Sequence, residues 1–169
     1  MQPQQLQPGA RGADTPALDA DDMAIDTLLR DLYQVISFAE GGEPEWERMA
    51  TLFSPHARIT RVTPEQIDYY DLASFQDMAR EMLDLGVYTS FHEREIMRSV
   101  QRFGAVAHVL SAYETKQSEQ AREPFARGVN SIQLVREGGG WRVLSLFWDE
   151  EQSGQPLRLD HLFAGGGVK

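Results

Sequence analysis

The spacing of apolar residues changes once along the chain, at Gly86. Before this residue they recur every three or four positions, as on one face of a helix. After it they alternate with polar residues, as in half-buried strands. Helices that precede a run of strands predict an α+β fold. We therefore expect a cone-shaped α+β domain in which three N-terminal helices pack on a curved antiparallel sheet.

The predicted elements follow this change of period. The first helix runs from about residue 21 to Gly41, the second from Pro44 to Ser54, and the third spans residues 71–85. A short strand is expected at residues 57–62, between the second and third helices. Two hairpins then follow, residues 91–117 with Gly104 at the turn, and residues 127–151 with a glycine triplet at the turn.

The two ends of the chain have a different composition. Residues 1–20 are rich in Gln, Pro, Gly and Asp without periodicity, which predicts a disordered lead-in. Residues 152–169 form a polar C-terminal tail. The sequence thus predicts a single domain over residues 21–151.

Composition excludes several classes of function. The formal net charge is −10 and no basic run occurs, so nucleic-acid binding is not expected. No apolar stretch reaches the roughly 18 residues of a membrane helix, so no membrane partner is expected. The absence of Cys excludes disulfides and thiolate chemistry and fits a cytoplasmic location, which we predict.

Neither a metal nor a cofactor is expected from the motifs. Alternation along "HERE" separates His92 from Glu93 and Glu95, so these residues do not converge on one metal ion and read as a solvated strand. The glycine triplet Gly138–Gly140 joins two strands and opens no helix, so it does not form a phosphate-binding loop.

Three segments together carry a family resemblance. The first helix, "LFSPHARITR" and the closing "GVNSIQLVREGGGWRVLSLFWDEE" resemble the nuclear-transport-factor-2-like (NTF2-like) superfamily, in its SnoaL-like and steroid-isomerase-like branch. The resemblance covers residues 21–151. It implies the cone-shaped fold, and it implies a range of functions that includes isomerases, dehydratases, hydrolases, and binding and assembly modules.

The resemblance also suggests roles for three positions. Tyr33 corresponds to the helix tyrosine that donates a hydrogen bond to an oxyanion in the steroid isomerases, and Asn130 to the second donor. The general base of that family corresponds to Arg61, and arginine cannot accept a proton. Isomerase chemistry of the family type is therefore not expected.

The resemblance implies that one set of alternating strand positions lines a pocket. We expect Arg61 at its mouth, where it would favour an anionic or carbonyl-bearing end on a ligand. Trp148 is read as part of the wall, although an ordinary core position would give it the same pattern. His108 is either a core histidine or a pocket residue. The predicted pocket comprises Tyr33, Phe53, Arg61, His108, Leu110, Asn130, Leu144, Leu146 and Trp148.

Three hypotheses of function follow. The first is a protein that binds a small hydrophobic molecule with one polar end. The second is an isomerase, dehydratase or hydrolase that uses Tyr33 and Asn130 as donors, with His108 or His56 as acid–base. The third is an interaction module. A homodimer is expected through the outer sheet face, which is predicted to carry His92, Ile96, Val100, Val109 and Tyr113.

Overall fold

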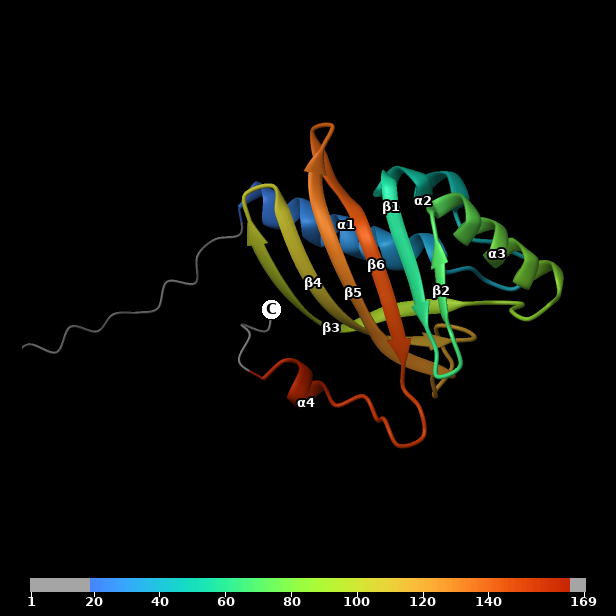
Figure 1. Ribbon diagram of the computed structural model, residues 1–169. Helices are drawn as coiled ribbons and strands as arrows, with labels where there is room; N and C mark the ends of the chain where they lie inside the picture. Colours follow the sequence, from blue (N-terminus) through green and yellow to red (C-terminus); the bar gives the residue numbers. More distant parts are fainter. Residues whose placement is uncertain (1–18, 165–169) are drawn as a thin grey trace, which may run out of the picture.

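The computed structural model describes residues 19–164, which form four helices and six strands (Figure 1). The helices are α1 (Ala20–Ile36), α2 (Trp46–Leu52), α3 (Leu72–Asp84) and the short α4 (Leu159–Leu162). The strands are β1 (Phe53–Val62), β2 (Ile67–Tyr70), β3 (His92–Phe103), β4 (Val106–Lys116), β5 (Ala126–Glu137) and β6 (Gly140–Glu150).

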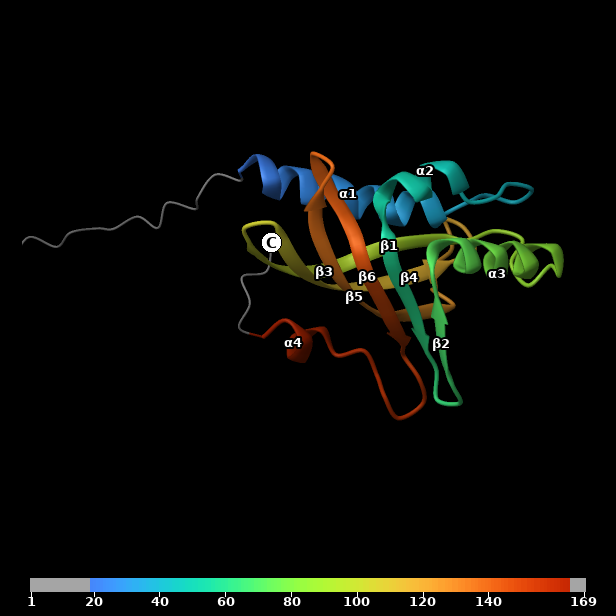
Figure 2. The same ribbon diagram turned by 45° about the horizontal axis from the view of Figure 1, so that its top comes forward.

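All six strands form one curved sheet in the order β2-β1-β6-β5-β4-β3. Helices α1 and α2 lie on one face of this sheet, which we call the inner face, and α4 lies on the opposite, outer side (Figure 2). The α+β class is therefore confirmed. The expected three helices become four, because α4 forms within the segment that we predicted to be only a polar tail.

The sheet is mixed, so the prediction of a purely antiparallel sheet is wrong. Strand β1 pairs parallel with β6, and Arg61 lies opposite Trp148 in this register. The other neighbouring strands pair antiparallel. A parallel pair needs a long crossover between its strands, and here the crossover is everything from β2 to β5. Alternation has the same period in both kinds of pairing, so the sequence pattern does not distinguish them.

Local sequence signals explain the helix boundaries. Asp19 caps α1 by accepting a hydrogen bond from the backbone N–H of Asp22, at 2.9 Å. Asp71 and Ser74 cap α3 reciprocally. The helix predicted over residues 71–85 is confirmed. The segment before it, for which we predicted neither helix nor strand, forms β2 and pairs with β1.

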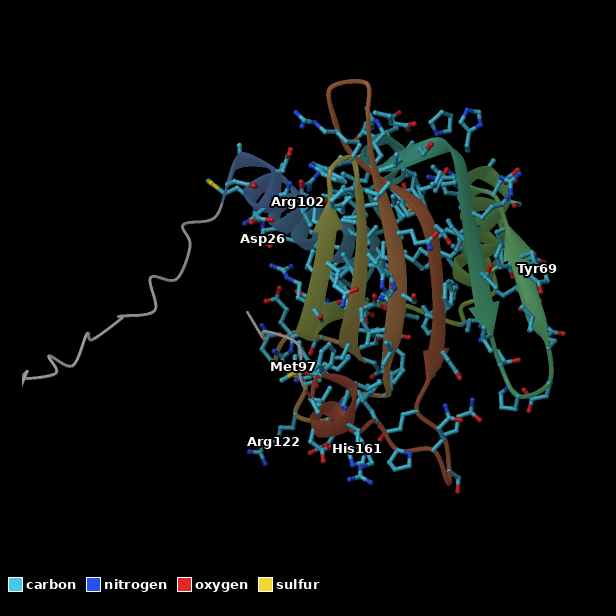
Figure 3. The ribbon with its side chains drawn as sticks, turned by 60° about the vertical axis from the view of Figure 1, so that its left-hand side comes forward. Asp26, Tyr69, Met97, Arg102, Arg122 and His161 are labelled. Carbon is cyan, nitrogen blue, oxygen red and sulfur yellow. The ribbon has the colours of Figure 1, made fainter. Side chains whose placement is uncertain are left out.

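Ion pairs hold the N-terminal half of α1 against the sheet. Arg98 of β3 contacts Asp26 at 2.9 Å, and Arg102 contacts Asp22 at 3.2 Å. Figure 3 shows Asp26 and Arg102 together where α1 meets the sheet. Beneath them, fully buried aliphatic side chains of α1 pack on the inner face, and this core includes Ile25, Leu29, Val35, Val109, Ile132 and Val143.

The face assignment of β4 is the reverse of the predicted one. Val109 and Tyr113 are buried on the inner face, whereas His108 is exposed and Leu110 points to the outer side. A shift of one residue moves every side chain of a strand to the other face. Both faces of β4 carry apolar residues, so alternation alone does not say which one is inside.

Three of the five residues predicted for the outer dimer face lie on the inner side of the sheet instead. Val109 and Tyr113 are buried in the interior, and Val100 packs against the core. These three residues therefore do not share an outer surface with His92.

A β-bulge removes Leu144 from the predicted pocket wall. Ser145 pairs with Gln133 and Val143 with Leu134, which leaves Leu144 without a partner in the ladder. The extra residue turns Leu144 outward, while Leu146 and Trp148 remain on the inner side.

Parts of the domain prediction fall outside the described residues. Of the predicted lead-in, only residues 19 and 20 are described, and they cap and begin α1. The last five residues of the predicted tail are likewise outside the described range. Among residues 19–164, no helix is long and apolar enough to cross a membrane.

Candidate functional site

A cavity of about 290 Å³ lies between the inner face of the sheet and helices α1, α2 and α3. Its volume equals that of about ten molecules of liquid water. Most of its lining is apolar, with Leu32 from α1, Met49 from α2, Phe75 and Met82 from α3, and Leu146 from β6. Small-molecule sites have this composition, in which a few polar groups are set among apolar ones.

Aromatic rings surround one side of the cavity. The rings of Tyr88 and Phe91 meet edge to face at 5.4 Å, and Tyr88 stacks on Phe125 at 6.0 Å. Phe125 lines the cavity and is 46% exposed, so this side opens toward solvent. The opposite wall is closed by Phe75 and Trp148, whose rings also meet edge to face.

The structure brings six of the nine predicted pocket residues to this cavity. Three of the predicted residues, His108, Leu110 and Leu144, do not line it. His108 instead lies on the outer face, where its Nε2 is 3.1 Å from the Ser131 hydroxyl. The six that line the cavity are Tyr33, Phe53, Arg61, Asn130, Leu146 and Trp148.

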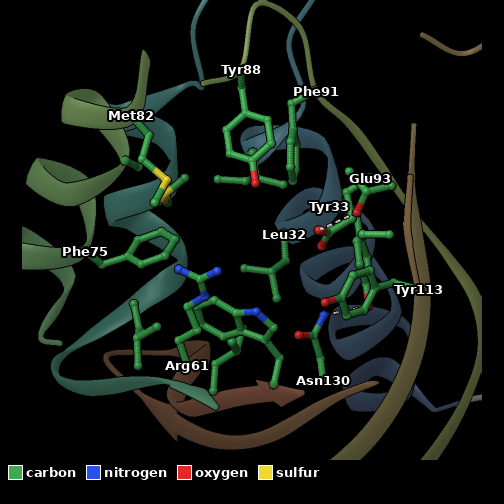
Figure 4. Close-up of a pocket in the computed structure, with 18 of the residues that line it drawn as sticks. Leu32, Tyr33, Arg61, Phe75, Met82, Tyr88, Phe91, Glu93, Tyr113 and Asn130 are labelled. Carbon is green, nitrogen blue, oxygen red and sulfur yellow. Dashed lines mark hydrogen bonds between the residues drawn. The ribbon is translucent and has the colours of Figure 1, made fainter. Parts of the chain in front are cut away.

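Polar side chains gather on the wall formed by α1, β3, β4 and β5. The Tyr33 hydroxyl is 2.6 Å from Ser111 Oγ, and Asn130 Nδ2 donates to Tyr33 at 3.1 Å. Both Tyr33 and Asn130 are buried, and burial raises the pKa of Tyr33 above its ordinary value. Figure 4 shows these residues beside Glu93 and Tyr113 at one side of the cavity.

Glu93 is the titratable group of this wall with a pKa near neutrality. Burial disfavours its charged form and raises its pKa from 4.5 to about 8, and the negative charge of Glu150 adds to this effect. Its Oε2 accepts a long hydrogen bond, 3.4 Å, from Thr115. At neutral pH the Glu93 carboxyl is therefore mostly protonated, and it can donate or accept a hydrogen bond inside the cavity.

Arg61 faces this wall from the other side of the cavity. Figure 4 shows its guanidinium pointing into the cavity, toward the polar cluster. Within residues 19–164 it makes no hydrogen bond or ion pair, although most other arginines of the domain have an acidic partner. A guanidinium with no direct ion-pair partner among residues 19–164 therefore lines a mostly apolar cavity.

No protein-family model matches the chain, and no curated protein matches it. Solved structures do. An NTF2-like protein of unknown function from Shewanella baltica is 17% identical, with 77% of this chain and 93% of that chain covered and a TM-score of 0.53. A protein with a cystatin-like fold from Nostoc punctiforme is 13% identical, with 80% and 96% covered and a TM-score of 0.62. The chain has the NTF2-like fold.

Solved structures similar to this one include proteins of different kinds. A putative scytalone dehydratase from Novosphingobium aromaticivorans is 13% identical, with 77% of this chain and 83% of that chain covered and a TM-score of 0.59. The fold alone does not select a function, so the argument must come from the site.

Glu93 and Tyr113 are among the cavity residues that the sequence analysis missed. Glu93 was read as part of a solvated strand, and Tyr113 was placed on the outer face. Tyr113 lines the cavity because β4 is turned the other way, and its ring lies over Gly128, where a side chain would collide with it. The paired acids of "HERE" were the available signal for Glu93, but an alternating acidic strand is usually solvated.

Among the described residues, no group of three or more His, Cys, Asp or Glu side chains lies close enough to hold a metal ion. The polar side chains that line the cavity include Tyr33 and Asn130, the carboxyl groups of Glu93 and Glu150, and the guanidinium of Arg61.

Proposed function

We propose that this protein binds a small, mostly apolar molecule with one polar end, held in a cone-shaped cavity between the sheet and helices α1 to α3. The observation that carries the proposal is the unpaired Arg61 guanidinium inside a mostly apolar cavity. Burial of apolar ligand surface against the aromatic walls supplies affinity, and the guanidinium fixes the orientation of the ligand.

The chemistry of Arg61 selects the polar end. A guanidinium donates two parallel hydrogen bonds to a carboxylate, and charge-assisted bonds of this kind are stronger than neutral ones. Glu150 also lines the cavity, but no ion pair joins it to Arg61 within the described residues. A carboxylate or carbonyl group on the ligand is therefore the partner that Arg61 lacks.

The experiment compares naphthoate with naphthalene by isothermal titration calorimetry. We expect the protein to bind both, and to bind naphthoate more tightly because of the charge-assisted bonds. Arg61→Gln should lower the affinity for naphthoate by about tenfold to a hundredfold and leave that for naphthalene nearly unchanged. Arg58→Gln is the matched control, since Arg58 lies on the same strand, is exposed and does not line the cavity. Equal losses in both variants would contradict the role of Arg61.

The enzyme hypothesis requires an acid–base histidine in the cavity. His108, one of its two proposed acid–base residues, lies on the outer face and bonds to Ser131. The other, His56, is exposed on β1 and does not line the cavity. Binding therefore explains the arrangement of the cavity with fewer assumptions than catalysis by Tyr33, Asn130 and His108.

We also propose self-association through the outer face of the sheet. Three side chains there, Tyr69, Leu144 and Phe147, form what we call the outer apolar patch. Tyr69 and Phe147 both lie opposite Thr60 in the strand register, and they are 75% and 43% exposed. Exposed apolar side chains that gather on one face of a sheet are candidates for an interface.

Light scattering over a range of concentrations tests this assembly. We expect a dimer mass for the unmodified protein and a shift toward monomer in Phe147→Glu, because a buried charge disfavours the interface. Leu85→Glu, at an exposed leucine of the loop after α3, should remain dimeric. A monomer mass at every concentration would rule the homodimer out.

A further inference from the structure

A chain of hydrogen bonds runs from a carboxylate outside the cavity to its polar wall. Ser111 Oγ donates to Glu95 Oε1 at 2.5 Å, and the same oxygen lies 2.6 Å from the Tyr33 hydroxyl. Asn130 Nδ2 donates to the Tyr33 hydroxyl at 3.1 Å. Ser111 is completely buried, so these contacts have no competition from bulk water.

The direction of every bond in this chain follows from Glu95. Its carboxylate is paired with Arg98 at 3.0 Å, and a carboxylate held by a guanidinium accepts hydrogen bonds. Ser111 has one hydroxyl proton and gives it to Glu95, so its oxygen must accept the proton of Tyr33. The Tyr33 proton is thereby directed away from the cavity.

The same reasoning orients the Asn130 amide. Because the Tyr33 proton is committed to Ser111, Tyr33 can only accept from Asn130, which places the amide nitrogen toward Tyr33. The amide oxygen is then free, and no hydrogen bond to it occurs among residues 19–164. In Figure 4 this oxygen points into the cavity. The buried wall therefore presents an acceptor to a ligand.

We infer that the molecule bound in this cavity carries a hydroxyl group, as an alcohol or a phenol does, which donates a hydrogen bond to the Asn130 amide oxygen beside Tyr33. This inference rests on the proposed function and adds a second polar group to the ligand, at the wall opposite Arg61. It reverses the donor role that the sequence suggested for Tyr33 and Asn130. The Tyr113 hydroxyl has no partner among the described residues, so it can donate to the oxygen of the same ligand hydroxyl.

A carbonyl group does not satisfy this wall. It could accept from Tyr113, but it would face the Asn130 oxygen with no proton between them, and that buried acceptor would remain unsatisfied. A hydroxyl group donates one hydrogen bond and accepts another. It is therefore the simplest group that can donate to the Asn130 oxygen and accept from the Tyr113 hydroxyl.

The test uses naphthol, naphthaldehyde and naphthalene, with both substituents at the same ring position, and measures each affinity by calorimetry. In the unmodified protein we expect naphthol to bind about threefold to tenfold more tightly than naphthaldehyde. Ser111→Ala removes the acceptor of the Tyr33 proton and frees the tyrosine to donate into the cavity. The preference for naphthol should then shrink or reverse. Ser131→Ala, at a serine of the outer face that bonds to His108, should keep the preference unchanged.

The outcomes separate this inference from the function on which it rests. Binding of naphthalene with equal affinities for naphthol and naphthaldehyde in the unmodified protein would overturn the inference and leave the apolar cavity standing. An unchanged preference in Ser111→Ala, with naphthalene binding intact, would overturn it as well. No binding of naphthalene at all would contradict both the proposed function and the inference.

Discussion

Replacing Glu93 with glutamine is expected to stabilise the protein at pH 8 and to flatten the dependence of its stability on pH. Burial raises the folded-state pKa of Glu93 from 4.5 to about 8. Between these values the folded protein keeps a proton that the unfolded chain has released, so the free energy of unfolding falls as pH rises. Below pH 4.5 both states are protonated and the penalty is absent.

The size of this effect follows from the width of that window. One pH unit corresponds to about 1.4 kcal/mol for a single proton. Multiplying this value by the whole pKa shift would give an upper limit for the destabilisation. Because the carboxyl faces a cavity and is only partly buried, we expect a total destabilisation on the order of 2–4 kcal/mol, below that limit. The glutamine in Glu93→Gln has no proton to lose. The free energy of unfolding of this variant should therefore exceed that of the unmodified protein by an amount that grows as pH rises from 4.5 to about 8.

Urea unfolding at several pH values, from about pH 5 to about pH 8.5, measures the difference. Glu119→Gln is the control, because Glu119 is exposed in the loop between β4 and β5 and no ion pair involves it within the described residues. Its stability curve should run parallel to that of the unmodified protein. If the Glu93→Gln curve were also parallel, Glu93 would not titrate in a buried environment.

Replacing Gly128 with alanine is expected to destabilise the fold and to narrow the cavity. A Cβ at this position would lie 2.5 Å from the Asp149 carbonyl oxygen and 2.7 Å from the Tyr113 hydroxyl. The first of these atoms is backbone in the neighbouring strand, so it cannot move aside at low cost. Overpacking of this kind costs about 1–3 kcal/mol.

The Tyr113 ring must also shift, and the cavity is the open space beside it. We therefore expect Gly128→Ala to weaken naphthalene binding as well as to lower the midpoint of urea unfolding. Gly140→Ala is the matched control at the start of β6, where a Cβ would meet nothing within 4 Å. Similar unfolding midpoints for the two variants would show that the neighbouring strand accommodates the methyl group.

The sequence by itself determined the types of the elements and most of their order. Helical spacing before Gly86 and alternation after it reflect one-sided burial along each element, which is a local property of the chain. The family resemblance, together with the alternation along β5 and β6, placed Asn130, Leu146 and Trp148 on the pocket side. Six of the nine residues predicted for the pocket, these three among them, line the cavity.

The tertiary structure alone decided how the strands pair and which face of β4 is inside. The parallel pairing of β1 with β6 joins segments far apart in the sequence, and no local pattern records it. His108 and Tyr113 exchanged their predicted sides because β4 has apolar residues on both faces, so only packing against α1 breaks the symmetry. Leu144 does not line the cavity, because a β-bulge in β6 interrupts the alternation of inward and outward side chains. Glu93 acquired its raised pKa from burial beneath the helices, since desolvation depends on what surrounds a carboxyl in space and not on its neighbours along the chain.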